Sequence, residues 1–446
     1  MTTYFVASGG SNTSPYDTWA KATTSLQTAL TIASADGDVV VIQYNAVPSG
    51  DAEVAADVTY TVAADVFVVS ASNDGGSAYT PTVMGTANWI GNSTTNRSIL
   101  IVGADTSSHW YGVTFRNAGS TADSFSLAGA NQVTRWESCY FWLGNTSTSA
   151  RINLTTNNAN GVARFIDCTF RFGNTSQAFC TAGAATIIGG SISSSGSTPS
   201  ILFKPPAATT SPSVSCSGFD ISLVTNGLVD DMDVPMSFKF ERCKFGSGVI
   251  VLASQTTNPT LASVDVWVSD CSSGDTHGLM GFYNALGSVV SDTGIYYTSG
   301  AAAQSWKIVT SANCNKSTPF RTPFVDMYYA TLTSMTPYFE VLRDGSATAY
   351  KDHEVWAEFY IKDGSGSTLA SAYTDRCTMA NYVSAGGSNQ ASGAGTGSWT
   401  GEGGTAWSGK CDSGNAGTPV EVGSLRGRIV FSATSATVYV DPQIRT

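Results

Sequence analysis

Phe165-Ile166-Asp167-Cys168-Thr169-Phe170 is one copy of a short phrase that returns along the middle of the chain. Close copies are Trp136-Glu137-Ser138-Cys139-Tyr140-Phe141 and Phe240-Glu241-Arg242-Cys243-Lys244-Phe245. We mark each copy by its Cys or by the residue in its place, at positions 113, 139, 168, 190, 216, 243 and 271. Successive marks are 26, 29, 22, 26, 27 and 28 residues apart. Such a period indicates a solenoid, in which each unit buries its apolar face against its neighbours.

The residue types within each unit predict strands. Runs such as residues 162–166 and 264–268 alternate, are rich in β-branched and aromatic residues, and are separated by Gly, Ser, Asn and Thr. A helical solenoid would need two amphipathic helices in each unit, and no such spacing is present. We therefore predict a parallel β-helix with one coil per repeat. Because a free Cys behaves as a small hydrophobe, we expect two interior ladders: one of Cys139, Cys168, Cys216, Cys243 and Cys271, and a neighbouring one of Phe115, Phe141, Phe170 and Phe245.

Residues 1–60 differ from the repeats and predict an N-terminal cap of strand, helix and strand. Tyr4-Phe5-Val6 leads into a polar loop, and Asp17 or Thr18 can N-cap a helix over residues 19–33. An apolar strand follows at residues 39–42. A solenoid has an open apolar end, so a capping unit is physically required. The apolar face of the expected helix consists of Ala22, Leu26, Ala29, Leu30 and Ala33.

The strand at Tyr4-Phe5-Val6, the Gly/Ser/Asn loop at 8–15, the helix led by Trp19 and the stretch Ala-Asp-Gly-Asp-Val-Val-Val-Ile at 35–42 together resemble a known cap. They are similar to the N-terminal cap of pectate-lyase-like right-handed β-helix proteins, a superfamily that includes bacteriophage tailspikes and many phage virion proteins. The resemblance covers roughly residues 1 to 320. It implies an all-β chain with a right-handed parallel β-helix over residues 61–320.

A composition shift near residues 319–323 precedes longer alternating strands, among them residues 354–361 and 428–431. This pattern predicts an antiparallel, jelly-roll-like β-sandwich over residues 321–446. Its ending, Val438-Tyr439-Val440-Asp441-Pro442, resembles the C-terminal strand of β-sandwich modules attached to phage β-helix proteins.

Composition excludes several classes of partner. The net charge is −11 over 446 residues, and the Lys and Arg residues are scattered, so we expect no nucleic-acid partner. Neither a signal peptide nor a stretch of 18 apolar residues is present, so we expect no export and no membrane partner. Nine Cys, five of them at the mark, favour reduced thiols made in a cytosol. Cys377 and Cys411 flank a Gly-rich segment and are candidates for a disulfide.

The sequence nominates no catalytic residue. β-helix lyases use carboxylate clusters that hold calcium, and β-helix hydrolases use paired Asp or Glu. The position before the mark carries Asp167, which is isolated, and Arg242 and Asp270, which we expect to form an ion pair between adjacent coils about 4.8 Å apart. The full set at this position reads Ser138, Asp167, Gly189, Ser215, Arg242 and Asp270.

We expect no metal and no cofactor. Asp230-Asp231-Met232-Asp233 lacks the pattern of an EF-hand loop and is typical of a solvated acidic turn. His109, His277 and His353 match no metal-binding spacing. The unusual surface candidates are Trp399 and Trp407, in the Gly-rich segment 386–414. They are candidates for stacking on a sugar or anchoring a neighbouring subunit, and the alternative is that they pack on the sandwich core.

These observations and the resemblance lead to a hypothesis of a non-enzymatic bacteriophage virion protein. It would be assembled in the host cytoplasm and act by adhesion as a head decoration or cement protein, with other virion proteins as partners and, by analogy, a homotrimer as its oligomer. The alternative is a tailspike or fibre that binds or cleaves host surface polysaccharide. Tailspikes usually carry a virion-anchoring domain before the β-helix, whereas this sequence starts at the cap. A secreted polysaccharide lyase is disfavoured by the missing signal peptide.

Overall fold

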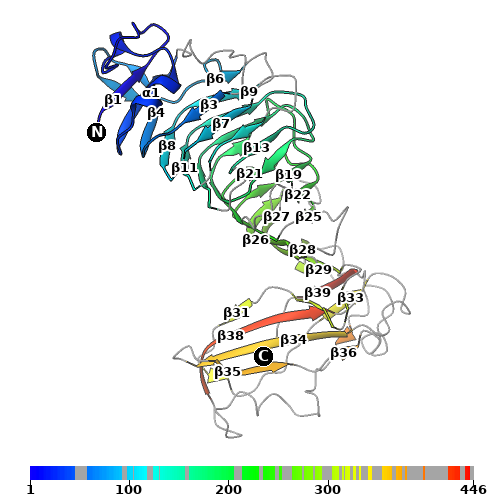
Figure 1. Cartoon of the computed structure of the whole chain (residues 1–446). Helices are drawn as coiled ribbons and strands as arrows, with labels where there is room; N and C mark the ends of the chain where they lie inside the picture. Colours follow the sequence, from blue (N-terminus) through cyan, green and yellow to red (C-terminus); the bar gives the residue numbers. More distant parts are fainter. Residues whose placement is uncertain are drawn as a thin grey trace. The chain divides into compact units, whose positions relative to one another are not determined.

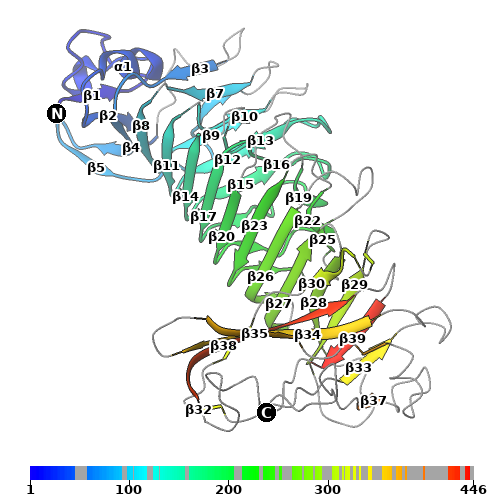
Figure 2. The same ribbon diagram turned by 60° about the horizontal axis from the view of Figure 1, so that its bottom comes forward.

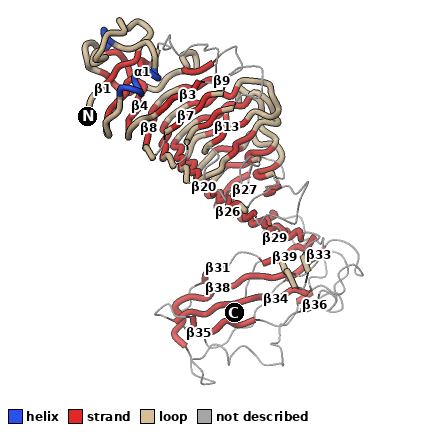
Figure 3. The backbone as a smooth tube through the Cα atoms, viewed as in Figure 1, coloured by secondary structure: helices blue, strands red, loops and turns tan. Residues whose placement is uncertain are grey.

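The computed structural model describes most of the N-terminal two thirds of the chain and mainly strands thereafter. The described residues are 1–45, 58–92, 98–103, 105–117, 124–129, 131–155, 160–204, 213–230, 235–246, 251–253, 264–273, 276–284, 287–293, 304–310, 314–315, 317–321, 325–327, 331–332, 340–343, 354–363, 368–373, 377–378, 395–396, 420–431 and 437–441. The chain divides into two compact units, Met1–Gly278 and Leu279–Thr446. Among the described residues, strand dominates both units, and the helix lies near the N-terminus (Figure 3).

The first unit is a parallel β-helix, as the repeat predicted. Each coil gives one strand to each of three faces, and equivalent strands of successive coils pair in parallel (Figures 1 and 2). Six consecutive coils run from β8 to β25. Face one consists of β1 Thr3–Val6, β2 Asp38–Gln43, β4 Val66–Asn73, β8 Ser107–Tyr111, β11 Val133–Glu137, β14 Val162–Ile166, β17 Ala184–Ile188, β20 Ser213–Ser217, β23 Met236–Glu241 and β26 Val264–Ser273, with β5 Tyr79–Pro81 antiparallel to β4.

In the other two faces, too, the strands are given in the order in which they occur along the chain. Face two consists of β6 Ile90–Asn92, β9 Thr114–Asn117, β12 Tyr140–Leu143, β15 Thr169–Phe172, β18 Ser191–Ile192, β21 Asp220–Ile221, β24 Lys244–Phe245 and the end of β26, whose Ser272 and Ser273 pair with β24. Face three consists of β3 Val58–Thr61, β7 Ile99–Val102, β10 Phe125–Ser126, β13 Arg151–Asn153, β16 Ala178–Cys180, β19 Ile201–Phe203, β22 Gly227–Val229 and β25 Val251–Ala253.

A left-handed residue directly before the mark makes the corner between face one and face two in each coil, and in one coil Gly190 at the mark is left-handed as well. The φ of the residue before the mark lies between 49° and 69°. Glycine adopts this conformation freely, Asn and Asp do so more readily than other residues, and the rest are strained there. The position before the mark is therefore a backbone corner, which gives Asp167 and Asp270 a structural role. The corner residues are Gly112, Ser138, Asp167, Gly189, Gly218, Arg242 and Asp270.

One mark was assigned wrongly. Cys216 pairs in register with Ile187 of β17 and Phe240 of β23, three residues before the mark in its coil. The mark of that coil is Phe219 and its corner is Gly218, so the expected Cys216 and Ser215 are corrected to these residues. Phe219 lies 29 residues after the preceding mark at position 190, whereas Cys216 lies 26 residues after it. A Cys at about the expected spacing therefore hid this difference of three residues. Cys139, Cys168, Cys243 and Cys271 occupy the mark, and the cysteines expected to be buried, Cys216 included, are buried free thiols.

The Phe ladder is confirmed, with two aliphatic members. Phe141 pairs in register with Phe115 on one side and Phe170 on the other. The ring centroids are 5.8 Å and 5.4 Å apart, and the rings are nearly parallel. We define the Phe ladder as Phe115, Phe141, Phe170, Ile192, Ile221 and Phe245.

The buried thiols are expected to resist modification in the native protein. Burial raises the pKa of Cys168 and of Cys216, which removes the reactive thiolate, and burial also blocks access of the reagent. We expect Ellman's reagent at pH 8 to leave the five repeat cysteines unlabelled until denaturant is added, with labelled sites assigned by peptide mass spectrometry. Rapid native labelling of these five would contradict the buried arrangement.

The N-terminal cap is present, but its helix is shorter than expected. A 3-10 turn, η1, spans Trp19–Lys21, and α1 spans Leu26–Ile32. The chain between them is extended because Thr23 pairs with the edge of β1, exchanging backbone hydrogen bonds of 2.9 Å with Phe5 and Ala7. Ser25, rather than Asp17 or Thr18, caps α1: its side chain accepts a bond of 3.3 Å from the Thr28 amide. The expected apolar face of Ala22, Leu26, Ala29, Leu30 and Ala33 is fully buried.

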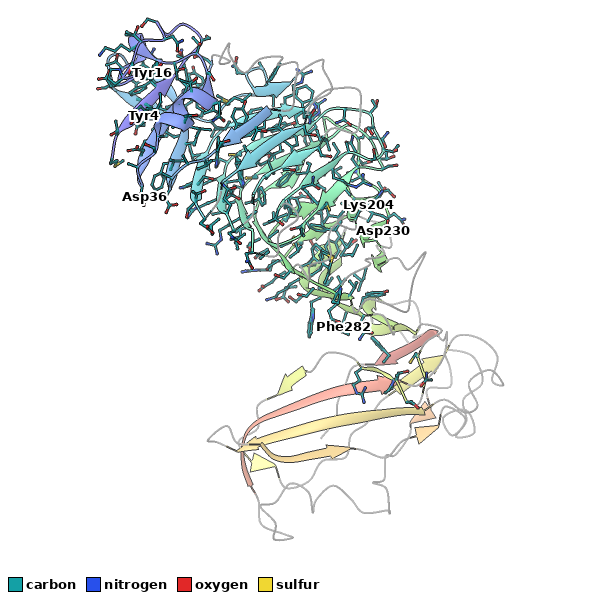
Figure 4. All side chains as sticks on the ribbon, in the orientation of Figure 1. Tyr4, Tyr16, Asp36, Lys204, Asp230 and Phe282 are labelled. Atoms are coloured by element: carbon teal, nitrogen blue, oxygen red, sulfur yellow. The ribbon has the colours of Figure 1, made fainter. Side chains whose placement is uncertain are left out.

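The second unit contains antiparallel strands. β28 Gly287–Thr293 pairs antiparallel with its neighbours, so residues 289–309 differ from the continued coil pattern that we expected. Phe282, labelled in Figure 4, stacks on Phe320 with ring centroids 6.1 Å apart. The packing of two sheets as a sandwich stays a prediction, as do the domain limits of 1–60, 61–320 and 321–446. The other strands are β27 Thr276–Asn284, β29 Gln304–Thr310, β30 Phe320–Arg321, β31 Val325–Met327, β32 Thr331–Leu332, β33 Glu340–Arg343, β34 Glu354–Asp363, β35 Thr368–Tyr373, β36 Cys377–Thr378, β37 Gly395–Thr396, β38 Val420–Phe431 and β39 Thr437–Asp441.

Candidate ligand-binding surface

Several residues singled out from the sequence lie outside the described residues. Trp399 and Trp407, Cys411 and the run 231–233 are among them, as is His353. The role of the two tryptophans and the pairing of Cys377 with Cys411 therefore stay predictions. Within the described ranges, no three His, Cys, Asp or Glu side chains come together as a metal site, and no helix is both long and apolar enough to span a membrane.

The carboxylates at the corner position do not form a pair. Asp167 and Asp270 are separated by four coils, which corresponds to about 19 Å along the solenoid. Paired acids that cleave a glycosidic bond lie roughly 5 to 9.5 Å apart. These two residues therefore cannot act on the same bond.

The expected ion pair between Arg242 and Asp270 is wrong. The Arg242 guanidinium lies 3.8 Å from the Glu241 carboxylate of its own coil and donates to the Ser217 hydroxyl of the preceding coil at 3.3 Å. The side chain thus turns toward the N-terminal end of the solenoid, away from the coil that carries Asp270. At a left-handed corner, stacking in register does not by itself make two side chains meet.

A polar cluster on face one is held together by ordinary surface contacts. The Glu137 carboxylate lies 3.1 Å from His109 Nε2 and 3.0 Å from the Arg135 guanidinium. The edge of the Phe67 ring packs against His109, with centroids 5.7 Å apart. Each charge has its partner within the cluster, and partly exposed pairs of this kind contribute about 0 to 1 kcal/mol to stability.

Face two carries an outward column in which tryptophan and arginine alternate. Arg116 of β9, Trp142 of β12 and Arg171 of β15 are in register on three successive coils. The three strands lie side by side in Figure 2. Both guanidinium carbons lie 4.0 Å from the centroid of the Trp142 ring. Arg116 also lies 5.1 Å from the ring centroid of Trp89, the residue before β6 in the preceding coil. We call these four residues the Trp–Arg column.

The period of the β-strand builds this column. In Tyr140-Phe141-Trp142-Leu143, as in the equivalent strands, alternate residues point inward, so the Phe and the residue two further on enter the core. The residue between them points outward and stacks on its counterparts in the neighbouring coils. A guanidinium is planar and packs well on an aromatic face. Each ring and guanidinium is thus held at the spacing of the coils.

The two arginines of the column have no described counter-charge. No carboxylate of the described residues forms an ion pair with Arg116 or Arg171, whereas Lys244 on the same face lies 3.2 Å from Asp220. Burial, and then the neighbouring charge of Arg171, lower the pKa of Arg116. Its buried Nε also has no hydrogen-bond partner among the described residues. The column therefore presents two positive charges whose donors are not used within the described protein.

Hydroxyl groups continue the surface along the next coil. The Tyr140 hydroxyl bonds to Ser193 Oγ at 3.2 Å, and Ser193 Oγ lies 2.8 Å from Ser195 Oγ. Ser193 follows β18, one coil beyond Arg171. Aromatic edges, free guanidinium donors and hydroxyls thus follow one another along one rigid face. This combination fits a ligand that offers both hydroxyl and negatively charged groups.

The sequence contained a signal for this column that we did not use. When the phrases are aligned on the mark, Arg116, Trp142 and Arg171 fall three residues after it. Alternation from the buried Phe puts all three on the outer surface. We considered only the position before the mark, where acidic catalysts were expected, and so missed the outward position.

The sequence matches no family model and no curated protein. Among solved structures, the enzymatically active domain of tailspike protein 4 from bacteriophage CBA120 is similar at 10% sequence identity with a TM-score of 0.21. The alignment covers 95% of this chain and 66% of that domain, so the chain spans just under two thirds of it.

Proposed function

We propose that this chain is a virion-associated β-helix protein that binds host-surface polysaccharide along face two. The Trp–Arg column carries the proposal, because aromatic rings, guanidinium donors and adjoining hydroxyls on a flat, rigid sheet suit a sugar polymer. The proposal includes the virion setting and the pectate-lyase-like superfamily, which rest on the resemblance of the cap. Of the tailspike or fibre alternative, which either binds or cleaves host surface polysaccharide, the proposal takes the binding of polysaccharide without its cleavage.

Rigidity is the physical advantage of such a surface. Arg116 and Trp142 are each held between two stacking partners, and Arg171 stacks on Trp142, so little side-chain entropy is lost when a ligand binds. The faces of the Trp142 ring are covered by the two guanidinium groups. A sugar therefore meets the ring edge and the guanidinium N–H groups, with hydroxyls at Tyr140 and Ser193 within reach of its neighbour in the polymer.

Adhesion to protein is the second candidate function, and one observation favours it. Face one exposes apolar side chains, with Phe67 at 49%, Val133 at 48% and Trp267 at 44% exposure. Exposed apolar groups on one face are typical of protein-binding surfaces. Head decoration, contact with other virion proteins and a homotrimer remain proposals that this face supports, through a contact of at least about 1,000 Å².

Replacing Trp142 by Ala is expected to weaken polysaccharide binding about tenfold or more, because both guanidiniums lose their common support. The measurement is retention of purified protein by immobilised host polysaccharide, with bound protein quantified against concentration. Trp267→Ala on face one is the matched control and should bind like the parent. Equal binding by the Trp142→Ala protein would refute the role of the column.

A further inference from the structure

We infer that the ligand of the Trp–Arg column is an acidic polysaccharide whose carboxylate groups pair with Arg116 and Arg171. The inference deepens the proposed function and rests on it. It specifies the charge of the ligand, which stacking and hydroxyl groups alone would leave open.

The column brings two positive charges close together. Arg116 and Arg171 approach the same ring from opposite sides, each with its guanidinium carbon 4.0 Å from the Trp142 centroid, and so lie within twice that distance of each other. Two like charges this close repel, and the lowered pKa of Arg116 reflects this in part. A carboxylate beside each guanidinium reduces the repulsion and accepts two parallel N–H bonds from the guanidinium fork.

The charge of the column is opposite to that of the protein as a whole. The chain has a net charge of −11, so a polyanion is repelled by the molecule as a whole. Some basic side chains elsewhere on faces one and two are neutralised locally, as Lys239 is by Glu241 at 3.1 Å and Arg135 by Glu137 at 3.0 Å, whereas Arg164 of β14 stands on face one without an ion pair among the described residues. No described carboxylate does this for Arg116 and Arg171. An acidic ligand would therefore be held at this column and repelled by the acidic remainder of the chain.

The spacing of the two arginines along the solenoid indicates how the ligand is oriented. The two arginines are two coils apart, with one tryptophan between them along the solenoid axis. A polymer that runs parallel to this axis, with an acidic group on alternate sugars, would place successive carboxylates at successive arginines. Its next sugar would meet the Tyr140, Ser193 and Ser195 hydroxyls, which suit a neutral residue.

The test compares matched polymers on the full chain. Binding of polygalacturonate and of hyaluronate is measured by calorimetry at low and at high salt, beside the carboxyl-reduced, neutral form of each. We expect binding of at least one acidic polymer, a dissociation constant at least tenfold weaker for its neutral form, and loss of affinity with salt. Arg116→Gln and Arg171→Gln should each weaken binding about tenfold, and Arg171→Lys, which keeps the charge, should weaken it less.

The controls separate the inference from the proposed function. Arg135→Gln removes a guanidinium from face one and should leave binding unchanged, and circular dichroism checks that each variant is folded. Equal binding of neutral and acidic polymers, lost on Trp142→Ala, would overturn the acidic ligand while leaving polysaccharide binding in place. Binding of neither form of either polymer would overturn the inference, and a host polysaccharide that still bound would preserve the proposed function.

Discussion

Leu30→Asp is expected to unfold the N-terminal cap and expose the open end of the solenoid. Leu30 lies in α1 and is fully buried, and α1 contacts strands β1, β2 and β3. Removing a buried leucine costs about 3 to 5 kcal/mol, and a buried carboxyl without a partner adds to this. We expect a loss of about 5 kcal/mol, which is comparable to the whole stability of many domains.

The loss of stability should be seen first at the N-terminal end of the solenoid. Neighbouring coils stabilise each other, so failure of the cap exposes the first coils before the last ones. Limited proteolysis should cut within residues 1–45, binding of a hydrophobic dye should rise, and the protein should aggregate. Thr31→Asp, which places the same charge on the exposed neighbour in α1, should cost less than about 1 kcal/mol. If both variants behaved alike, the capping role of α1 would be wrong.

The core was predictable because coils that stack in register place similar residue types at the same interior position of each repeat. Any coil alone is a weak signal, but recurrence of Cys and Phe at one period identified the solenoid and its two interior ladders. The buried face of α1 was also predictable, since Leu26, Ala29 and Leu30 have helical spacing. The first part of the expected helix was wrong because pairing of Thr23 with β1 depends on a strand distant in sequence. Tertiary pairing of this kind overrides local propensity.

The candidate site was less predictable than the core, for a different reason. Interior positions accept few residue types, so they repeat along the sequence, whereas outward positions vary from coil to coil. Cys216 was aligned wrongly because it is the residue type found at the mark, although it pairs with Ile187, three residues before the mark of the neighbouring coil. The Trp–Arg column became evident only when register placed Arg116, Trp142 and Arg171 on adjacent coils and the charges around them could be compared.

Phe141→Ala is expected to destabilise the β-helix most among single changes in the Phe ladder. Phe141 is fully buried, and its ring contacts both ladder neighbours. It also packs edge-on against Phe125, Trp136 and Phe165, at centroid distances between 5.3 and 6.1 Å. Truncation of a buried Phe costs about 3 to 5 kcal/mol, to which the lost ring pairs contribute.

Two further variants make the size of this effect interpretable. Ile192 and Ile221 fill the same position two and three coils further on, so the ladder accepts a branched aliphatic side chain, and Phe141→Leu should cost only about 1.5 kcal/mol. Phe67→Ala removes a ring that is 49% exposed on face one and should cost less than about 1 kcal/mol. Denaturant unfolding followed by tryptophan fluorescence gives the three values. If Phe141→Ala were no more destabilising than Phe67→Ala, the rings could not be packed as a continuous interior ladder, because truncating any of its inner members must leave a cavity that the coils on either side cannot fill.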